Sequence, residues 1–197
     1  MMLTKEEAVC FESQIAYKIY NSRTNAYPFP HGQIENFLPA ELINSVLGHW
    51  PSQKEFTSNK DSGSVRNTEG KRIPEDHPYN FRHQIALTDK PEIENITGEN
   101  FEFWKSFTDI LCSRKIINAF IALYAKNLVK RFKLDEFNDL FKKMVYSPSI
   151  HLIHDKTNYA LGPHTDNEGK VIVILIYFES DLEEGKNSLG TSVYIPK

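Results

Sequence analysis

Apolar side chains recur at helical spacing in the first 21 residues of the chain. Phe11, Ile15 and Ile19 fall four residues apart within the segment 5–21. This period places the three side chains on one face of an α-helix. The segment therefore predicts an amphipathic helix.

A second helix is predicted after Leu38-Pro39. It carries apolar residues through Leu47, and Pro51 ends it because proline lacks the N–H that a helix interior needs. Residues 33–37 predict a short strand between the two helices. The segment 57–72 is polar and rich in Ser, Asn and Gly, which predicts a long loop. Arg82–Leu87 predicts a further strand.

From Phe101 the apolar period is helical again. Trp104, Phe107 and Leu111 lie on one face of a predicted helix. Ser113 is a suitable N-cap for the next helix, because its hydroxyl can accept a hydrogen bond from a free backbone N–H. The apolar stripe of that helix comprises Ile117, Phe120, Ile121, Tyr124 and Leu128. We interpret this stripe as core packing, and expect a third, shorter helix over 135–143.

After Met144 the pattern favours strands. Residues 149–154 and 191–195 predict short strands. The continuous apolar run KVIVILIYF at 170–178 predicts a central strand covered on both faces and among the least exposed segments. We thus expect an α+β chain, with a mainly helical part over 1–144 and the first strands of a β-fold over 145–197.

Composition and charge exclude several classes of protein. The net charge of −3 comes from 23 basic and 26 acidic residues without a basic stripe, so we predict no nucleic-acid binding. Two isolated cysteines fit neither a disulfide scaffold nor a zinc finger, and they suit a reducing compartment. The N-terminus lacks the apolar core of a signal peptide, and no run reaches the roughly 18–20 residues that span a bilayer. We expect a cytoplasmic protein that does not bind membranes.

The candidate chemistry lies in the stretch Leu-Gly-Pro-His164-Thr-Asp166. If this stretch is extended, the imidazole and the carboxylate stand on one face, with Cα atoms roughly 6.5 Å apart. Imidazole and carboxylate are ligands that suit iron(II), and a distant second histidine would complete a facial triad. A bare His-x-Asp pattern is weak, because both residues also serve as hydrogen-bonding groups in turns. His151 and His154 would point to opposite faces of a strand.

The wider sequence around this motif resembles a family of bacterial 2-oxoglutarate/iron(II) oxygenases. The family motif Gly-Tyr-x-Leu-Gly-Pro-His-Thr-Asp is matched within NYALGPHTDNEGKVIVILIYF (158–178), except that Asn158 replaces the glycine. A second family motif, Leu-Gly-Thr-Ser-x-Tyr-x-Pro-Lys, is matched within SLGTSVYIPK (188–197). Similar words occur upstream at 29–31, 36–39 and 103–104.

The resemblance implies a double-stranded β-helix, or jelly roll, with helices packed outside it. It also implies a dioxygenase that decarboxylates 2-oxoglutarate to succinate while oxidising a small-molecule or sugar-like substrate, with ascorbate as an accessory reductant. His164 and Asp166 would hold the iron. Tyr159 and Tyr177 are candidates for contact with 2-oxoglutarate, although both also suit core or strand-edge packing.

The sequence departs from this family in one respect. No His or Arg follows Asp166, whereas the family places its second metal histidine and the arginine that binds 2-oxoglutarate in later strands. We therefore expect a partial or truncated jelly roll that is inactive alone. Two alternatives stay open: a non-catalytic jelly-roll binding module, and a zinc hydrolase using His164 and Asp166.

Overall fold

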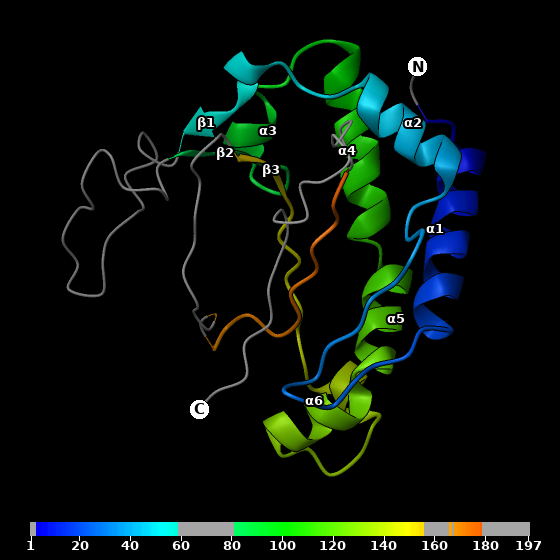
Figure 1. Ribbon diagram of the computed structural model, residues 1–197. Coiled ribbons are helices and arrows are strands. Elements are labelled where there is room, and N and C mark those ends of the chain that lie inside the picture. Colours follow the sequence, from blue (N-terminus) through cyan, green and yellow to red (C-terminus); the bar gives the residue numbers. More distant parts are fainter. Residues whose placement is uncertain (1–2, 59–80, 156–165, 167, 179–197) are drawn as a thin grey trace, which may run out of the picture.

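The computed structural model describes residues 3–58, 81–155, 166 and 168–178, which form an α+β arrangement (Figure 1). Its longer helices are α1 (Lys5–Tyr20), α2 (Ala40–Gly48), α4 (Glu99–Leu111), α5 (Arg114–Leu123) and α6 (Ala125–Phe132). Shorter elements are the 3₁₀ turn η1 (Gln53–Glu55), α3 (Lys90–Ile93) and α7 (Asp139–Lys142). The strands are β1 (Thr57–Ser58), β2 (Arg82–Ala86) and β3 (His151–Asp155).

Helix α1 forms where its apolar period predicted it. Thr4 caps the first turn: its hydroxyl accepts from the Glu7 N–H at 3.2 Å, and the Glu7 carboxylate accepts from the Thr4 N–H at 2.8 Å. This reciprocal capping box satisfies two backbone donors that a helix start leaves free. The buried face of the helix carries Ile15 and Ile19 and packs against α4 and α5 (Figure 1).

Helix α4 supplies the largest side chains of the core. Phe103 and Trp104 are fully buried, and the indole N–H of Trp104 donates to the His49 carbonyl at 2.7 Å. Ser113 caps α5 as predicted, accepting from the Ile116 N–H at 3.3 Å. The predicted helix through Leu128 is instead two helices, α5 and α6, joined at Tyr124.

The three strands form one antiparallel sheet in the order β1-β2-β3. Arg82 lies opposite Asp155, and its guanidinium donates to both carboxylate oxygens at 2.7 Å. This two-bond fork is the strongest geometry for such a pair. Ile85 and Leu152, also opposite each other, are buried and attach the sheet to the main core. Strands β1 and β2 come from the part of the chain predicted as mainly helical.

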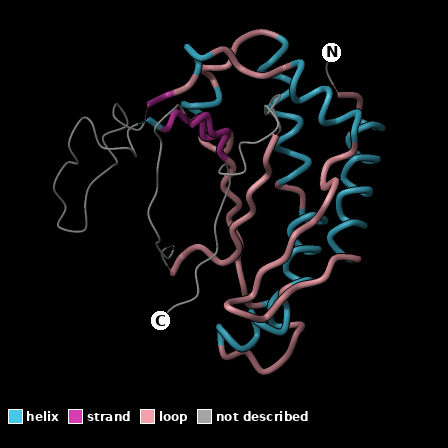
Figure 2. The backbone as a smooth tube through the Cα atoms, in the orientation of Figure 1, coloured by secondary structure: helices cyan, strands magenta, loops and turns pink. Residues whose placement is uncertain are grey.

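Three sequence predictions are wrong in detail. Residues 33–37 form no strand; Glu35 and Asn36 lie in a turn, with Asn36 at φ 49°. Of the helix expected over 135–143, only the four residues of α7 form. Residues 170–178 follow an irregular path without strand pairing among the described residues (Figure 2).

The run 171–178 is also not among the least exposed segments. Ile172, Ile176 and Phe178 pack against the main core, but Val173 and Leu175 are 52% and 53% exposed. The physical reason is that the helices and neighbouring segments cover one side of the run, and no second layer of described residues covers the other. The central strand predicted here is therefore a one-sided apolar segment.

The described residues thus show an α+β chain with a small antiparallel sheet. The jelly roll and the division at residue 144 stay predictions, and the strand expected over 191–195 lies outside the described residues. No helix within the described ranges is both long and apolar enough to cross a bilayer.

Candidate functional site

The His-x-Asp motif is only partly within the described residues. His164 and Tyr159 lie outside them, so the expected orientation of His164 relative to Asp166 stays a prediction. Asp166 is described and lies on the surface, just before the turn that leads into the apolar segment 171–178.

The Asp166 carboxylate forms an ion pair with Lys170. Lys170 Nζ donates to Asp166 Oδ1 at 2.6 Å, and the two side chains are 53% and 34% exposed. Ion pairs this exposed contribute little stability, because water screens the charges. The pair nevertheless bears on metal binding, since a cation at Asp166 would share this carboxylate with the ammonium group.

Arg131, at the end of α6, holds the turn that follows Asp166. Its guanidinium donates to the backbone carbonyls of Glu168 at 2.6 Å, Lys170 at 3.3 Å and Val171 at 3.4 Å. Arginine suits this role because it presents five N–H donors in a fixed plane. The contacts join the second apolar cluster, built around Ile121, Leu128 and Leu140, to the chain just after the motif.

This role of Arg131 could not be predicted from the sequence. It belongs to the cluster Lys126, Lys130, Arg131 and Lys133, whose helical spacing predicts a solvated face. Arg131 binds backbone carbonyls, which every residue carries. The amino-acid sequence therefore contains no pattern that would separate Arg131 from the neighbouring basic residues.

Tyr177 lies on the outward side of the apolar segment. It is 62% exposed, whereas the next residue, Phe178, packs edge-on against Trp50 with ring centroids 5.8 Å apart. Contact of Tyr177 with 2-oxoglutarate stays a prediction, and a ligand reaching it would approach from that outward side.

A hollow lies between α3 and the segment before β3. It has a volume of about 560 Å³ and is lined by Lys90, Glu92, Ser149 and His151, among others. His151 Nε2 is 3.0 Å from Ser149 Oγ, but the Glu92 carboxylate accepts from the Ala86 N–H at 2.7 Å instead of orienting the imidazole. The described contacts thus provide a serine–histidine pair without a third, orienting group, which triad catalysis requires.

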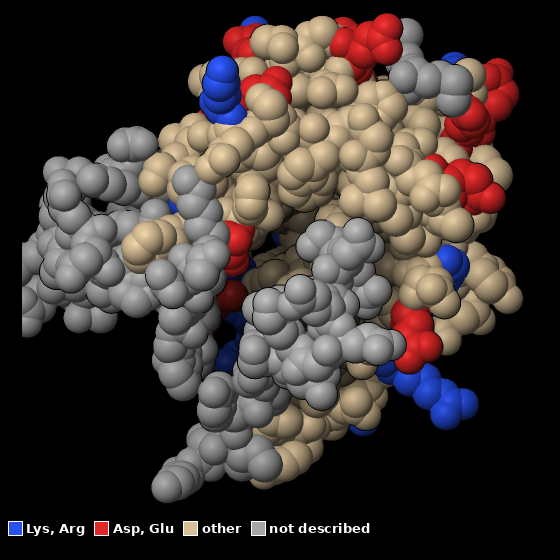
Figure 3. All heavy atoms as spheres, turned by 45° about the horizontal axis from the view of Figure 1, so that its top comes forward, with Lys and Arg blue, Asp and Glu red and all other residues tan. Residues whose placement is uncertain are grey.

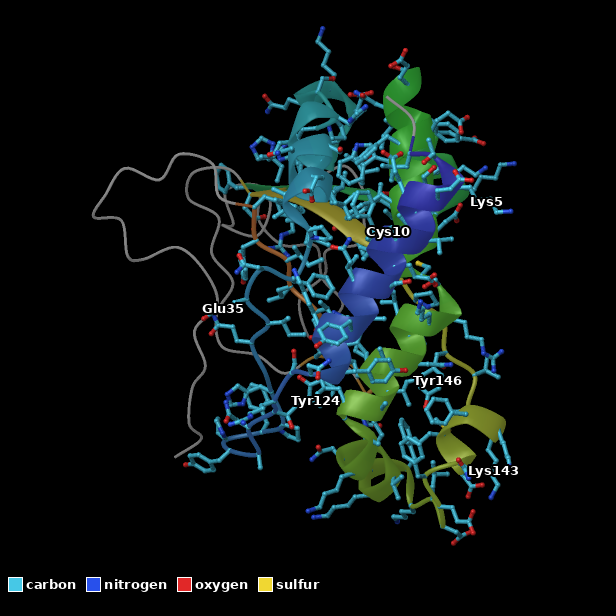
Figure 4. All side chains as sticks on the ribbon, turned by 90° about the vertical axis from the view of Figure 1, so that its right-hand side faces the viewer. Lys5, Cys10, Glu35, Tyr124, Lys143 and Tyr146 are labelled. Carbon is cyan, nitrogen blue, oxygen red and sulfur yellow. The ribbon has the colours of Figure 1, made fainter. Side chains whose placement is uncertain are left out.

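Burial changes the acidity of two phenols at the other end of the molecule. Tyr124 and Tyr146 lie near α5, and burial raises the pKa of each (Figure 4). The Tyr146 hydroxyl is buried without a hydrogen-bond partner among the described atoms. Since both rings pack against the second apolar cluster, we assign them a structural role.

The described Lys and Arg side chains form no stripe on the face that Figure 3 shows. Many of the described Asp and Glu side chains lie along its upper and right edges, others lie left of its centre, and the described Lys and Arg side chains are scattered. The absence of nucleic-acid binding stays a prediction.

The described residues contain no group of three His, Cys, Asp or Glu side chains arranged to hold a metal ion. The fit of iron therefore depends on the chemistry of the donors: an imidazole and a carboxylate two residues apart suit iron(II). Comparison of the chain with family models, curated proteins and solved structures gave no match.

Proposed function

We propose that this chain forms part of an iron(II)- and 2-oxoglutarate-dependent dioxygenase with a jelly-roll core. The observation that carries the proposal is the motif Leu-Gly-Pro-His164-Thr-Asp166. The apolar segment 170–178 and the segment SLGTSVYIPK (188–197), which also resemble the family, follow it. The substrate class we propose is a small or sugar-like molecule, acted on in the cytoplasm.

In this proposal His164 and Asp166 hold the iron. The bound metal and 2-oxoglutarate together supply the oxidising chemistry, and the protein supplies position and exclusion of water. Lys170 Nζ lies 2.6 Å from Asp166 Oδ1, so its positive charge competes with the metal for this carboxylate. Arg131 fixes the turn after Asp166 by holding three of its carbonyls.

The ligand set needs two groups that do not follow Asp166 in this sequence: a second histidine, and an arginine for the distal carboxylate of 2-oxoglutarate. An arginine–carboxylate pair is a strong, often two-bonded contact. We therefore expect the 197-residue chain alone to bind iron(II) poorly and to form no succinate.

The test is succinate formation with iron(II), ascorbate and 2-oxoglutarate. If the same gene has a longer product with a further histidine and arginine, that product is expected to form succinate, and His164→Ala or Asp166→Ala in it is expected to abolish the activity. Lys170→Met removes the competing charge and serves as the matched control, because it is expected to retain activity. Turnover by the 197-residue chain itself would mean that a third ligand lies within it, with His151 and His154 as the first candidates.

The Asp166–Lys170 pair favours a second candidate function, a non-catalytic binding module with the same fold. A cation that binds Asp166 must compete with the Lys170 ammonium for the carboxylate, which weakens its binding. If the longer product binds no iron(II) and does not decarboxylate 2-oxoglutarate even without substrate, the binding module is the better explanation.

A further inference from the structure

The register of the sheet places two histidines directly opposite each other. His83 on β2 pairs with His154 on β3, two residues from the buried pair Ile85–Leu152. Because side chains alternate along a strand, both histidines project from the face that carries Ile85 and Leu152. His151 pairs with Ala86 and therefore projects from the opposite face.

The surroundings of this histidine pair combine an apolar wall with access to solvent. The His154 ring contacts Phe56 edge-on, with centroids 5.7 Å apart and an interplanar angle of 78°. Phe56 is itself buried and packs near Trp50. His83 is half-buried and His154 is exposed, so the pair lies where the core-facing side of the sheet meets water.

The spacing of the pair suits one metal ion. Directly opposed residues on antiparallel strands have Cβ atoms about 5 Å apart. Two imidazole nitrogens that bind one ion at about 2.0–2.1 Å lie roughly 3 Å from each other. Rotation about the side-chain bonds of two histidines spans this difference without moving the strands.

The local charge also permits a cation. The nearest ionic group in the register is Arg82–Asp155, which is internally neutralised and occupies the adjacent row on the other face. Imidazole is a preferred ligand of zinc, nickel and copper ions.

From this juxtaposition we propose that His83 and His154 form a two-histidine site for a divalent late-transition-metal ion. Water completes the coordination, and the bound ion links β2 to β3. The site uses neither His164 nor Asp166 and does not depend on the proposed function.

The experiment measures Ni²⁺ binding to the untagged 197-residue chain by calorimetry. His164→Ala/Asp166→Ala serves as the background, so that the proposed iron ligands cannot contribute. In that background we expect one Ni²⁺ site, weakened at least about tenfold by His83→Ala and equally by His154→Ala. The matched control is His151→Ala, on the same strand but the opposite face, which is expected to leave the affinity unchanged.

Two further readouts separate metal binding from folding. Circular dichroism checks that each variant keeps its helices, and Cu²⁺ electron paramagnetic resonance should show two coupled nitrogens that fall to one in either single variant. Ni²⁺ should also raise the thermal midpoint of the background protein but not of the variants. Unchanged Ni²⁺ affinity in a folded His83→Ala or His154→Ala variant, or an equal loss in His151→Ala, would overturn the proposal.

Discussion

Helix α4 and the segment 171–178 are both rich in large apolar residues, yet only the helix buries them. Phe103, Trp104 and Phe107 are at most 3% exposed, whereas half of the apolar segment faces solvent. The other side of the helix carries polar residues, so one neighbouring layer is enough to bury its apolar side chains. The segment is apolar on both sides and would need two layers. Apolar content therefore predicts how much cover a segment requires, but not whether that cover is present.

Among substitutions that compare α4 with the segment 171–178, we expect the largest loss in the free energy of unfolding at Trp104. Trp104→Ala removes a fully buried indole and its hydrogen bond to His49, so we expect a loss of about 3–5 kcal/mol in the free energy of unfolding. Urea denaturation followed by circular dichroism measures it. Trp104→Phe retains most of the apolar volume and should cost less, which keeps the test informative if the alanine variant does not fold. A loss below about 1 kcal/mol for alanine would contradict the packing described for α4.

A smaller loss in the free energy of unfolding is expected for a substitution at the start of α5. Ser113→Ala removes the N-cap hydroxyl that accepts from the Ile116 N–H, and such losses cost about 1 kcal/mol. The same denaturation experiment applies. Ser113→Asp is the control, because it restores an acceptor at the cap and should recover most of the stability.

The predictions for the first part of the chain were largely correct because the patterns behind them are local. The α1 period, the Ser113 cap and the strand around Ile85 each depend on residues within a few positions of one another. The break at Tyr124 was missed because the apolar stripe continues through it while the backbone does not.

The candidate site was less predictable because its determinants are distant in sequence. Arg131 lies 37 residues from Glu168, whose carbonyl it holds, and His83 lies 71 residues from its partner His154. Only the strand register brings the two histidines together. The motif at His164 and Asp166 rests on resemblance, and its role as a metal site stays a prediction because His164 lies outside the described residues.

Arg131 tests how the apolar segment is attached to the helices. Arg131→Met retains the aliphatic stem but removes the hydrogen bonds to the turn after Asp166. We expect the turn to open more readily by roughly 1 kcal/mol, so that cleavage after Glu168 by a glutamate-specific protease becomes about fivefold faster. Mass spectrometry of the released peptides measures the rate. Lys130→Met, one residue away, is the control, and equal acceleration by both variants would argue against the Arg131 contacts.

Two Asp–Lys pairs with the same i,i+4 spacing allow a comparison of charge. The Asp139 side chain is 12% exposed against 34% for Asp166. The hydrogen bond from Lys143 lowers the pKa of the Asp139 carboxyl below its ordinary value. Because the folded state then binds fewer protons than the unfolded state, this contribution is present above the ordinary pKa near 4 and is lost as the pH falls through the lower folded value.

Asp139→Asn is therefore expected to lower the free energy of unfolding at pH 6. It should also make the free energy of unfolding fall less steeply as the pH drops below 4. Urea midpoints across this range measure the change. Glu102→Gln, an exposed change on α4, controls for the loss of one negative charge. An unchanged acid slope in Asp139→Asn would mean that the Lys143 contact does not persist in solution.

The smallest effect is expected on the outer side of the apolar segment, and it tests the comparison most directly. Leu175 is 53% exposed, so Leu175→Thr should change the free energy of unfolding by no more than about 0.5 kcal/mol. Its neighbour Ile176 packs against the main core, and Ile176→Thr should cost roughly 1 kcal/mol or more because it exposes a partly buried pocket to a hydroxyl. Both substitutions shorten an aliphatic side chain to threonine in the same segment, so their difference isolates which side is covered. If Leu175→Thr proved as costly as Ile176→Thr, another part of the chain would have to cover the outer side in solution, and the two-sided burial expected for a central strand would be restored.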